Sequence, residues 1–411
     1  MKKPRHASAV INAFEVENGE LVFAGIPLSR LAEQIGQTPF YAYDRASITR
    51  RVAHLRDHLP SAIHIHYAIK ANPMPALVQH LSGLIDGFDL ASGGEMRLAL
   101  DTTMPVANIS FAGPGKSIGE IRSAIAAGVT LNLESNTELD LTVQQGEQLG
   151  ITPRVALRIN PDFELKSSGM KMGGGPKPFG VDEEQASEML QRIGSLGLDF
   201  QGLHIFSGSQ NLNPQAIIEA QKNTLALACR LMENAPAPLK TINLGGGFGI
   251  PYFPGDEPLD LRPIGESLQQ HLTSAESLFP GIKLVLELGR YLVGEAGIYV
   301  CRVLDKKVSR GEVFLISDGG LHHHLAASGN FGQVIRKNFP LCIGNRMEQS
   351  EREVATVVGR LCTPLDVLAD RMELPVAEVG DLVVIQQSGA YGLSASPTAF
   401  LSHPPPAEVL V

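Results

Sequence analysis

Between residues 40 and 290, short apolar runs recur at roughly thirty-residue intervals and alternate with amphipathic segments. Each run has the length and composition of a buried β-strand, and the segments between them have helical periodicity. The eight runs are 64–71, 87–92, 109–114, 130–135, 154–160, 200–206, 241–247 and 283–289. Eight strands alternating with helices over about 250 residues are typical of a (β/α)8 barrel. We therefore predict an α/β fold built on such a barrel, with an open, doubly wound sheet as the alternative.

The two ends of the chain follow a different, strand-rich pattern. Residues 11–25 resemble a β-hairpin whose turn is Asn18-Gly19, a pair that favours tight hairpin turns. After residue 295, strand-like runs follow one another without helical segments between them. We predict three parts: an N-terminal segment over residues 1–39, the barrel over 40–294, and an all-β domain over 295–411 with which the first segment packs.

Composition and charge exclude several classes of protein. Of the 411 residues, 44% are hydrophobic and 19% are charged, which is typical of a globular chain. The net charge of −9 argues against a nucleic-acid partner, which a basic face would attract. No run approaches the ~20 apolar residues of a membrane span, so we expect no membrane partner. Four cysteines without a CxxC pair favour a reduced, cytoplasmic protein.

Polar residues gather where the predicted strands end. In a barrel of this kind, the active site lies at the C-terminal ends of the strands. A buried charge without a partner is costly, so several charges on one rim are hard to explain by packing alone. The residues in question are Lys70, Asp89, Arg158, His204, Glu287 and Arg290.

Lys70 is the candidate nucleophile of this rim. It belongs to the stretch HYAIKANP, residues 66–73, in which most neighbours are apolar. Desolvation disfavours the ammonium form and lowers the pKa of a lysine, and a neutral amine condenses with an aldehyde to form a Schiff base. The structural alternative is a lysine whose amine simply reaches solvent at a strand end.

A glycine cluster follows the seventh run. Gly245, Gly246 and Gly247 expose backbone N–H groups that suit a phosphate, although an ordinary tight turn is the alternative. An aldehyde-binding lysine together with a phosphate site indicates pyridoxal 5′-phosphate. Glu287 and His204 are the residue types expected to pair with the ring nitrogen of that cofactor and to stack on its face.

The motifs together resemble those of a known family, the fold-type III pyridoxal-phosphate-dependent decarboxylases. This is the group of diaminopimelate, ornithine and arginine decarboxylases, and its barrel is related to that of alanine racemase. The resemblance covers nearly the whole chain, through HYAIKANP, FDLASGGE, LHIFSGSQ, NLGGGFG, ELGR, GRLCTPLD and SGAYGLSAS. It implies an amino-acid decarboxylase that binds pyridoxal 5′-phosphate and forms a homodimer with shared active sites.

The resemblance also implies how the cofactor is held. Lys70 forms the Schiff base, His204 stacks on the ring, and Glu287 pairs with the ring nitrogen. Asp89 lies near Lys70 and the cofactor, and Arg158 lies near the phenolic oxygen. The residues expected to hold the phosphate are Ser207, Gly245, Gly246, Gly247, Arg290 and Tyr391.

The same resemblance places the substrate-binding groups in the second domain. Cys362 is expected to reach the active site of the partner subunit and to protonate the carbon that CO₂ leaves. Thr363, Asp318 and Tyr391 are the expected substrate contacts. The family normally has an acidic residue at position 363, which recognises a distal basic group. A neutral Thr363 cannot pair with a distal ammonium in this way, which makes a free diamino acid a less secure substrate.

One glycine-rich segment narrows the resemblance further. The stretches DFELKSSGMKMGGGPKPFGVD and GNFGQ resemble a subgroup associated with exosortases and an enzyme that decarboxylates a glutamyl group on an acyl carrier protein. Carrier proteins are acidic, and this segment contains Lys166, Lys171 and Lys177. The substrate is therefore expected to be either a free amino acid or a carrier-tethered aminoacyl group; a solvated loop is the alternative explanation of the lysines.

The residue at 287 distinguishes two reactions on this fold. Loss of CO₂ leaves a carbanion, and a protonated pyridine nitrogen is the electron sink that spreads its charge. A neighbouring carboxylate keeps that nitrogen protonated, whereas alanine racemases present an arginine there. Glu287 therefore favours a decarboxylase over a racemase, and a pyridoxal-phosphate carrier without turnover is the alternative outside the enzymes.

The run His322-His323-His324 is the remaining candidate for a metal site. Adjacent residues on a strand point to opposite faces and cannot chelate one ion well. We therefore expect no metal.

Overall fold

The computed structural model describes residues 14–164, 170–171, 173–333 and 336–411. Contacts divide the chain into two compact units. The β unit comprises residues 1–49, 251–257 and 293–411, and the barrel unit comprises residues 50–250 and 258–292.

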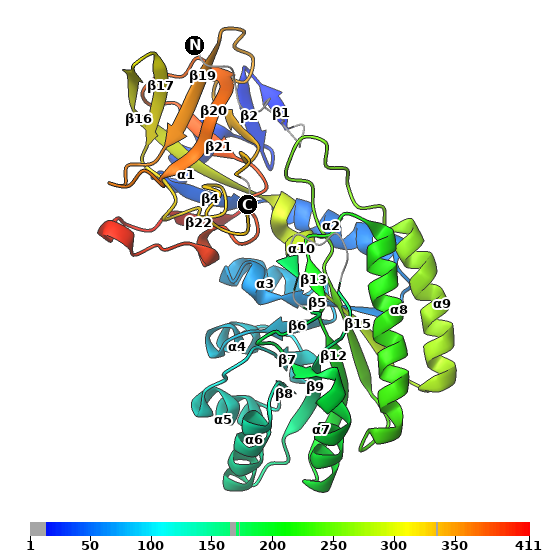
Figure 1. The fold of residues 1–411 in the computed structure, drawn as a ribbon. Coiled ribbons are helices and arrows are strands. Elements are labelled where there is room, and N and C mark those ends of the chain that lie inside the picture. Colours follow the sequence, from blue (N-terminus) through cyan, green and yellow to red (C-terminus); the bar gives the residue numbers. More distant parts are fainter. Residues whose placement is uncertain (1–13, 165–169, 172, 334–335) are drawn as a thin grey trace. The chain divides into compact units, whose positions relative to one another are not determined.

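The barrel unit is built on a closed ring of parallel strands (Figure 1). The eight strands of the ring are β5 (Ile63–Ala68), β6 (Gly87–Leu90), β7 (Ile109–Phe111), β8 (Thr130–Leu133), β9 (Arg154–Asn160), β12 (Asp199–Ile205), β14 (Thr241–Gly246) and β15 (Lys283–Leu288). Pairing of β15 with β5 closes the ring, and β8 pairs with β9. The predicted (β/α)8 barrel is confirmed, and the open doubly wound sheet is excluded.

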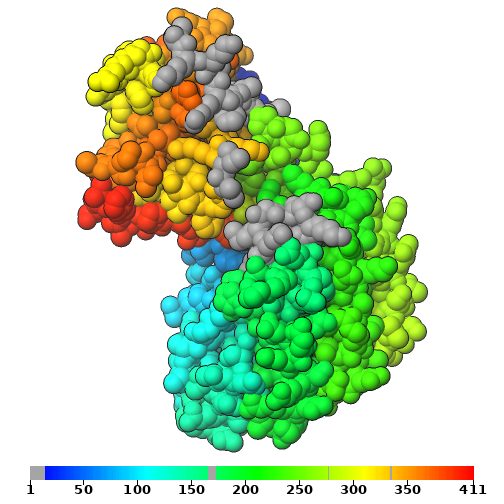
Figure 2. Space-filling model, in the orientation of Figure 1, coloured from blue at the N-terminus to red at the C-terminus, as the bar shows by residue number. Residues whose placement is uncertain are grey.

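Helices surround the ring and connect its strands (Figure 1). They are α3 (Pro75–Ser82), α4 (Gly93–Leu100), α5 (Ile118–Ala127), α6 (Asn136–Leu149), α7 (Glu183–Ser195), α8 (Pro214–Leu231), α9 (Arg262–Leu278) and the short α10 (Arg290–Val293); α2 (Arg45–His58) precedes β5. Ser92, Ser117 and Ser135 cap α4, α5 and α6, each accepting a hydrogen bond from a backbone N–H of the first turn. On the surface of this unit, atoms from successive parts of the sequence, coloured from cyan to yellow-green, lie next to one another (Figure 2).

Three short strands lie outside the ring. β11 (Val181–Asp182) pairs with the C-terminal end of β9, while β10 (Met170–Lys171) pairs with β13 (Gly208–Ser209). These strands tie the glycine-rich segment between β9 and α7 to the C-terminal ends of β9 and β12.

The β unit contains one large sheet and one small sheet. The large sheet consists of β4 (Phe40–Tyr43), β16 (Gly297–Ser309), β17 (Glu312–Ser317), β18 (Leu341–Ile343), β19 (Arg352–Val358), β20 (Val367–Pro375), β21 (Leu382–Ile385) and β22 (Ala407–Leu410). The small sheet consists of β1 (Glu15–Glu17), β2 (Glu20–Phe23) and β3 (Ile26–Pro27), and α1 (Leu28–Ile35) follows it.

The first predicted boundary moves in the structure. β4, which the sequence analysis assigns to the barrel, pairs with β16 and with β22 in the β unit. Its four residues are all buried in that unit. The contacts of residues 251–257 assign this segment to the β unit as well, rather than to the barrel.

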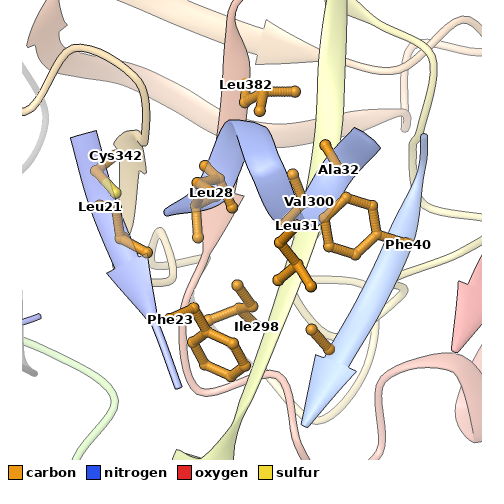
Figure 3. Packing of buried hydrophobic residues seen from close by; sticks show 12 residues of the cluster. Leu21, Phe23, Leu28, Leu31, Ala32, Phe40, Ile298, Val300, Cys342 and Leu382 are labelled. Atoms are coloured by element: carbon orange, nitrogen blue, oxygen red, sulfur yellow. The ribbon is translucent and has the colours of Figure 1, made fainter. Parts of the chain in front are cut away.

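The core of the β unit joins segments that are distant in the sequence. Leu28 and Leu31 of α1 pack with Phe40 of β4, and with Ile298 and Val300 of β16 (Figure 3). The turn between β1 and β2 is Asn18-Gly19, with φ of 53° and 76°, as the hairpin prediction requires. Residues 11–13 of the predicted hairpin lie outside the described residues.

Among the helices that the structure describes, none combines the length and the hydropathy that a bilayer-spanning helix needs.

Three consecutive buried histidines lie in a turn of the β unit, not on the strand that the sequence analysis assumed. His322, His323 and His324 are each 0% exposed. His323 donates to the carbonyl of Pro404 at 3.0 Å, and His324 Nε2 forms a 2.9 Å hydrogen bond with the hydroxyl of Ser388. Two of the three rings therefore use a ring nitrogen in a hydrogen bond to another protein group.

Burial keeps these rings neutral. The pKa of His322 is lowered to about 3, that of His323 to about 4 and that of His324 to about 3. Desolvation is the main cause in each case, and the neighbouring His403 and Arg360 contribute for the first two. Burial acts in the opposite sense on two nearby carboxyls: it raises the pKa of Asp318 and of Asp366.

We expect acid to destabilise the β unit through these histidines. Their folded pKa values lie below the unfolded value of ~6.5, so the unfolded chain binds protons first as the pH falls. Their contribution to the free energy of unfolding is complete above about pH 6.5. Between about pH 6.5 and pH 5, each histidine loses on the order of 1–2 kcal/mol of this contribution. The raised pKa values of Asp318 and Asp366 partly offset this loss.

Urea unfolding between pH 5 and pH 8 measures this dependence. Replacing one titrating ring, His324→Gln, should flatten the fall in unfolding free energy over this range. The same change at the partly exposed His58 of α2 serves as the control and should leave the slope nearly unchanged. An unchanged slope in His324→Gln would show that this ring is not held neutral by the fold.

Candidate active site

A carboxylate, an amine and an imidazole meet at the C-terminal ends of β5, β12 and β15. The carboxylate of Glu287 lies 3.5 Å from the amine of Lys70 and 3.0 Å from Nε2 of His204. Glu287 and His204 are buried, at 6% and 2% exposure. The structure thus brings together three of the residues that the sequence analysis selected.

Lys70 differs in two ways from its predicted setting. It lies in a short 3-10 helix, Ile69–Ala71, directly after β5, and not in the strand itself. Its side chain is 37% exposed and its amine lies 5.3 Å from the ring centroid of Phe206. The amine is therefore more accessible than a position inside an apolar strand would allow. Tyr67 supports the turn by donating its hydroxyl to the carbonyl of Asn72 at 2.9 Å.

The electrostatics of this cluster favour an ionised Glu287. Burial alone would raise the pKa of the carboxyl, but the charge of Lys70 and the hydrogen bond from His204 outweigh it. Together they hold the pKa of Glu287 well below its ordinary value. The site therefore presents a permanent negative charge at neutral pH.

Strand register explains why these residues converge. His204 is level with Arg158 on β9 and with Asn243 on β14, and Glu287 is level with Gly246. Residues at the same level of neighbouring parallel strands belong to one layer of the barrel. The periodic pattern of the sequence thus places distant side chains on one rim.

Arg158 is held by a residue that the sequence analysis missed. Its guanidinium donates to Glu134 at 2.8 Å, and both side chains are buried. Glu134 directly follows β8 and could have been found by the rule that selected the other rim residues, since a polar side chain ends a predicted strand. The run 130–135 contained it, but it was not considered.

Asp89 contacts a second histidine that the sequence analysis missed. One carboxylate oxygen of Asp89 accepts a hydrogen bond from the hydroxyl of Ser110, and the other lies 3.4 Å from Nδ1 of His66. These atoms of Asp89 and His66 have no hydrogen-bond partner among the described residues. His66 and Asp89 line a cavity of about 70 Å³, together with His204 and Asn132, and a cavity of this size with several polar groups in its wall can hold water.

The glycine cluster lies where the backbones of β14 and β15 approach each other closely. A Cβ atom on Gly246 would lie 1.9 Å from the carbonyl oxygen of Glu287, so only glycine fits there. Gly245 and Gly247 have φ of 69° and 78°, which glycine adopts readily. Ser207 follows β12 beside this cluster in the ring order, and Arg290 begins α10 after β15.

This donor set suits pyridoxal 5′-phosphate. Lys70 offers an accessible amine for the aldehyde, and Glu287 offers an ionised carboxylate for the pyridine nitrogen. A hydroxyl at Ser207 and a guanidinium at Arg290 are groups that bind phosphate. The sequence analysis expects exposed N–H groups at the three glycines, but Gly245 and Gly247 are buried, and the Gly245 N–H donates to the side chain of Asn243 at 2.9 Å.

Cys362 and Thr363 lie in the β unit, in the turn between β19 and β20. Cys362 is exposed, which sets it apart from the usual buried cysteine. The turn is fixed by the carboxylate of Asp366, which accepts from the N–H groups of Leu321 at 2.7 Å and Leu361 at 2.9 Å. Cys362 is thus presented at a defined surface turn rather than packed in a core.

Asp318 and Tyr391 also belong to the β unit. The two carboxylate oxygens of Asp318 accept hydrogen bonds from Thr38 at 2.5 Å and from the N–H of Arg302 at 2.8 Å, which favours a structural role. Tyr391 has φ of 53°, a left-handed backbone conformation that is uncommon outside glycine. Its roles in phosphate and substrate binding stay predictions.

Comparison with known proteins is consistent with this site. Residues 45–294 match the family described as "Pyridoxal-dependent decarboxylase, pyridoxal binding domain". The chain is 40% identical over 380 residues to an L-glutamyl-[BtrI acyl-carrier protein] decarboxylase of Niallia circulans, covering 91% of this chain and 89% of that protein. It is 32% identical to a diaminopimelate decarboxylase of Aquifex aeolicus, covering 97% and 92%.

Solved structures agree in fold. A diaminopimelate decarboxylase from M. jannaschii, in complex with L-lysine, superposes with a TM-score of 0.87 at 27% identity and covers 97% of this chain and 92% of its own. Both the family match, which spans more than half of the chain, and the architecture therefore lead to one conclusion. The chain belongs to the fold-type III pyridoxal-phosphate-dependent decarboxylases.

Proposed function

We propose that Lys70, Glu287 and His204 form the catalytic centre that removes the α-carboxylate of an aminoacyl substrate as CO₂. The observation that carries this proposal is the position of the buried Glu287 carboxylate, 3.5 Å from the Lys70 amine and 3.0 Å from His204. An amine for the cofactor aldehyde and a negative charge for its ring nitrogen thus lie within one cluster.

When bound, pyridoxal 5′-phosphate supplies the electron sink for the electron pair that the departing CO₂ leaves. The protein supplies the surrounding charges. Lys70 provides the amine that binds the aldehyde, and Glu287 holds a proton on the ring nitrogen because an opposite charge favours the charged form. The His204 ring, fixed by its hydrogen bond to Glu287, is positioned by the protein before the cofactor binds.

The remaining cofactor contacts follow the same proposal. Arg158 would lie near the phenolic oxygen of the cofactor, and Asp89 would lie near Lys70 and the cofactor. The groups that hold the phosphate are Ser207, Gly245, Gly246, Gly247, Arg290 and Tyr391. The buried, ionised Glu287 favours decarboxylation over racemisation, since it strengthens the electron sink.

We propose a carrier-tethered aminoacyl group as the substrate. Similarity to the Niallia circulans enzyme, whose printed name gives a glutamyl carrier protein as substrate, supports this choice. Thr363 supports it as well, because a neutral side chain does not select a distal ammonium. Lys171 and Lys177 lie in the glycine-rich segment and suit an acidic carrier, while Lys166 lies outside the described residues.

A homodimer with shared active sites completes the proposal. The exposed turn that presents Cys362 suits a group that acts on another subunit. Its thiol is proposed to donate a proton to the carbon from which CO₂ departs. Sedimentation equilibrium, with mixtures of Cys362→Ala and Lys70→Ala chains assayed for restored turnover, tests both parts.

Replacing Lys70 by Ala should abolish the covalent link to the cofactor. Borohydride reduction of the wild-type protein loaded with pyridoxal phosphate should leave a pyridoxyl group on the peptide that contains Lys70, as read by mass spectrometry. The Ala variant should show neither this adduct nor CO₂ release. Lys283→Ala, at the opposite end of β15, is the control and should retain both. An adduct on another lysine would contradict the proposal.

Replacing Glu287 by Gln should slow CO₂ release by roughly 10²–10³-fold, the range typical of losing one preorganised electrostatic group. The amide preserves the shape of the side chain but not the charge that stabilises a protonated ring nitrogen. Single-turnover release of ¹⁴CO₂ measures the chemical step directly. The control is Glu120→Gln, a carboxylate that caps α5; its rate should stay within about twofold of wild type. A fast Glu287→Gln variant would exclude the proposed role.

The substrate proposal predicts a preference for a glutamyl group on a carrier protein over free amino acids. A panel of free diaminopimelate, ornithine, lysine and glutamate should release CO₂ at least about tenfold more slowly, in kcat/KM, than glutamyl carrier protein. Lys177→Glu should raise KM for the carrier with little change in kcat, whereas Lys283→Glu should not. Turnover of a free diamino acid alone would disprove the tethered substrate but not the decarboxylase.

A further inference from the structure

The carboxylate of Glu134 joins three parts of the barrel rim. Its Oε1 accepts hydrogen bonds from the N–H of Gly113 at 2.5 Å and from Arg158 at 2.8 Å, and its Oε2 accepts from the N–H of Gly180 at 2.9 Å. Gly113 follows β7, Arg158 lies on β9, and Gly180 ends the glycine-rich segment. A single side chain, 6% exposed, thus links all three.

Arg158 is fixed between this carboxylate and an aromatic ring. The guanidinium carbon of Arg158 lies 5.2 Å from the ring centroid of Phe179, the residue before Gly180. The two contacts that locate the guanidinium therefore come from Glu134 and from the end of the glycine-rich segment. A cation between a carboxylate and an aromatic face is held both by charge and by orientation.

The end of the glycine-rich segment is pressed against the strand that carries Arg158. Val181 and Asp182 pair with Ile159 and Asn160 of β9. A Cβ atom on Gly180, whose φ is 74°, would lie 2.8 Å from the backbone nitrogen of Asn160. The Gly180 N–H reaches Glu134 only while this close approach persists, so docking of the segment and completion of the Glu134 cluster occur together.

Positive charges and an N–H group stabilise the ionised form of Glu134. Burial raises the pKa of a carboxyl, but Arg158, Lys116 and the Gly180 N–H outweigh it and lower the pKa of Glu134. Lys116 itself is buried and bonds to Glu138 at 2.5 Å and to two backbone carbonyls, those of Gly113 and Asn132, at 2.9 Å. The carboxylate is therefore ionised when it meets the guanidinium.

We infer that Glu134 is a positioning residue that couples docking of the glycine-rich segment to the orientation of Arg158 in the cofactor site. It acts through Arg158 and does not touch the reacting atoms. Release of the segment would remove the Gly180 N–H from Glu134 and the Phe179 ring from Arg158. The guanidinium would then keep its contact with Glu134 but lose its contact with the aromatic ring. The inference rests on the proposed function in one respect, that Arg158 faces the cofactor.

Hydrogen exchange tests the docking half of this inference without any assay of activity. Glu134→Gln keeps the size of the side chain but removes its charge. In the full-length protein, amide exchange in the peptide spanning residues 179–182 should become at least about tenfold faster. Glu120→Gln is a matched control, because Glu120 also accepts a backbone N–H from a neighbouring element, that of Gly93 at the start of α4 at 2.8 Å, while its other hydrogen bonds among the described residues are to Ser117. Its exchange at 179–182 should not change.

A double-mutant cycle tests the Arg158 half. The dissociation constant of pyridoxal phosphate is measured by fluorescence titration for wild type, Glu134→Gln, Arg158→Gln and the double variant. Each single change should weaken binding at least about fivefold, and the double variant should bind no more weakly than Arg158→Gln alone. Additive effects would mean that Glu134 only stabilises the fold, and would overturn the inference.

The outcomes separate the inference from the function beneath it. If Arg158→Gln leaves the dissociation constant unchanged, the proposed role of Arg158 in cofactor binding fails. If Arg158→Gln weakens binding but Glu134→Gln changes neither binding nor exchange at 179–182, the coupling fails alone. Thermal unfolding of each variant identifies one that does not fold; Glu134→Asp then repeats both measurements, because it keeps the charge but withdraws it from Arg158 and Gly180.

Discussion

The buried negative charge of Glu287 is the interaction on which the site depends. A carboxylate that is 6% exposed is costly unless positive charge or hydrogen bonds compensate it. Lys70 and His204 provide that compensation at 3.5 Å and 3.0 Å. The same requirement fixes the geometry, because both partners must lie where the C-terminal ends of β5, β12 and β15 bring them. An amine for an aldehyde and a charge for a pyridine nitrogen are thereby held close together, which is the arrangement that the family's chemistry needs.

The parallel ring converts sequence spacing into this geometry. Each strand delivers its last residues to one rim, so side chains separated by more than two hundred residues, such as Lys70 and Glu287, become neighbours. Close packing of the strand ends also accounts for the glycines. Gly246 carries no Cβ because the carbonyl of Glu287 occupies that space, so the glycine cluster has a structural cause beside its suitability for phosphate.

Much of this could be predicted from the sequence, and the failures have identifiable causes. The eight strands stood out because strands buried on both faces are continuous apolar runs bounded by turns. Residues 40–43 fell inside the predicted barrel because the domain boundary was placed at residue 40, and only the pairing of β4 with β16 and β22 shows that it belongs to the second sheet. Glu134 and His66 were missed because their importance lies in contacts with Arg158 and Asp89, which spacing alone does not reveal. The histidine run was interpreted as part of a strand, because three identical adjacent residues have no periodic pattern that distinguishes a strand from a turn.

The division of labour between the two units bears on how such an enzyme changes its substrate. Every residue of the Glu287 cluster and of the Glu134 cluster lies in the barrel unit, where the charges compensate one another and a single substitution disturbs several partners. Cys362 and Thr363 lie instead on a surface turn of the β unit, whose backbone is fixed mainly by the carboxylate of Asp366, with a 3.4 Å hydrogen bond from the Leu365 N–H to the Thr363 hydroxyl. If this turn contacts the substrate as proposed, a change of side chain at position 363 would alter the preference for an aminoacyl group while the charge clusters of the barrel stay intact.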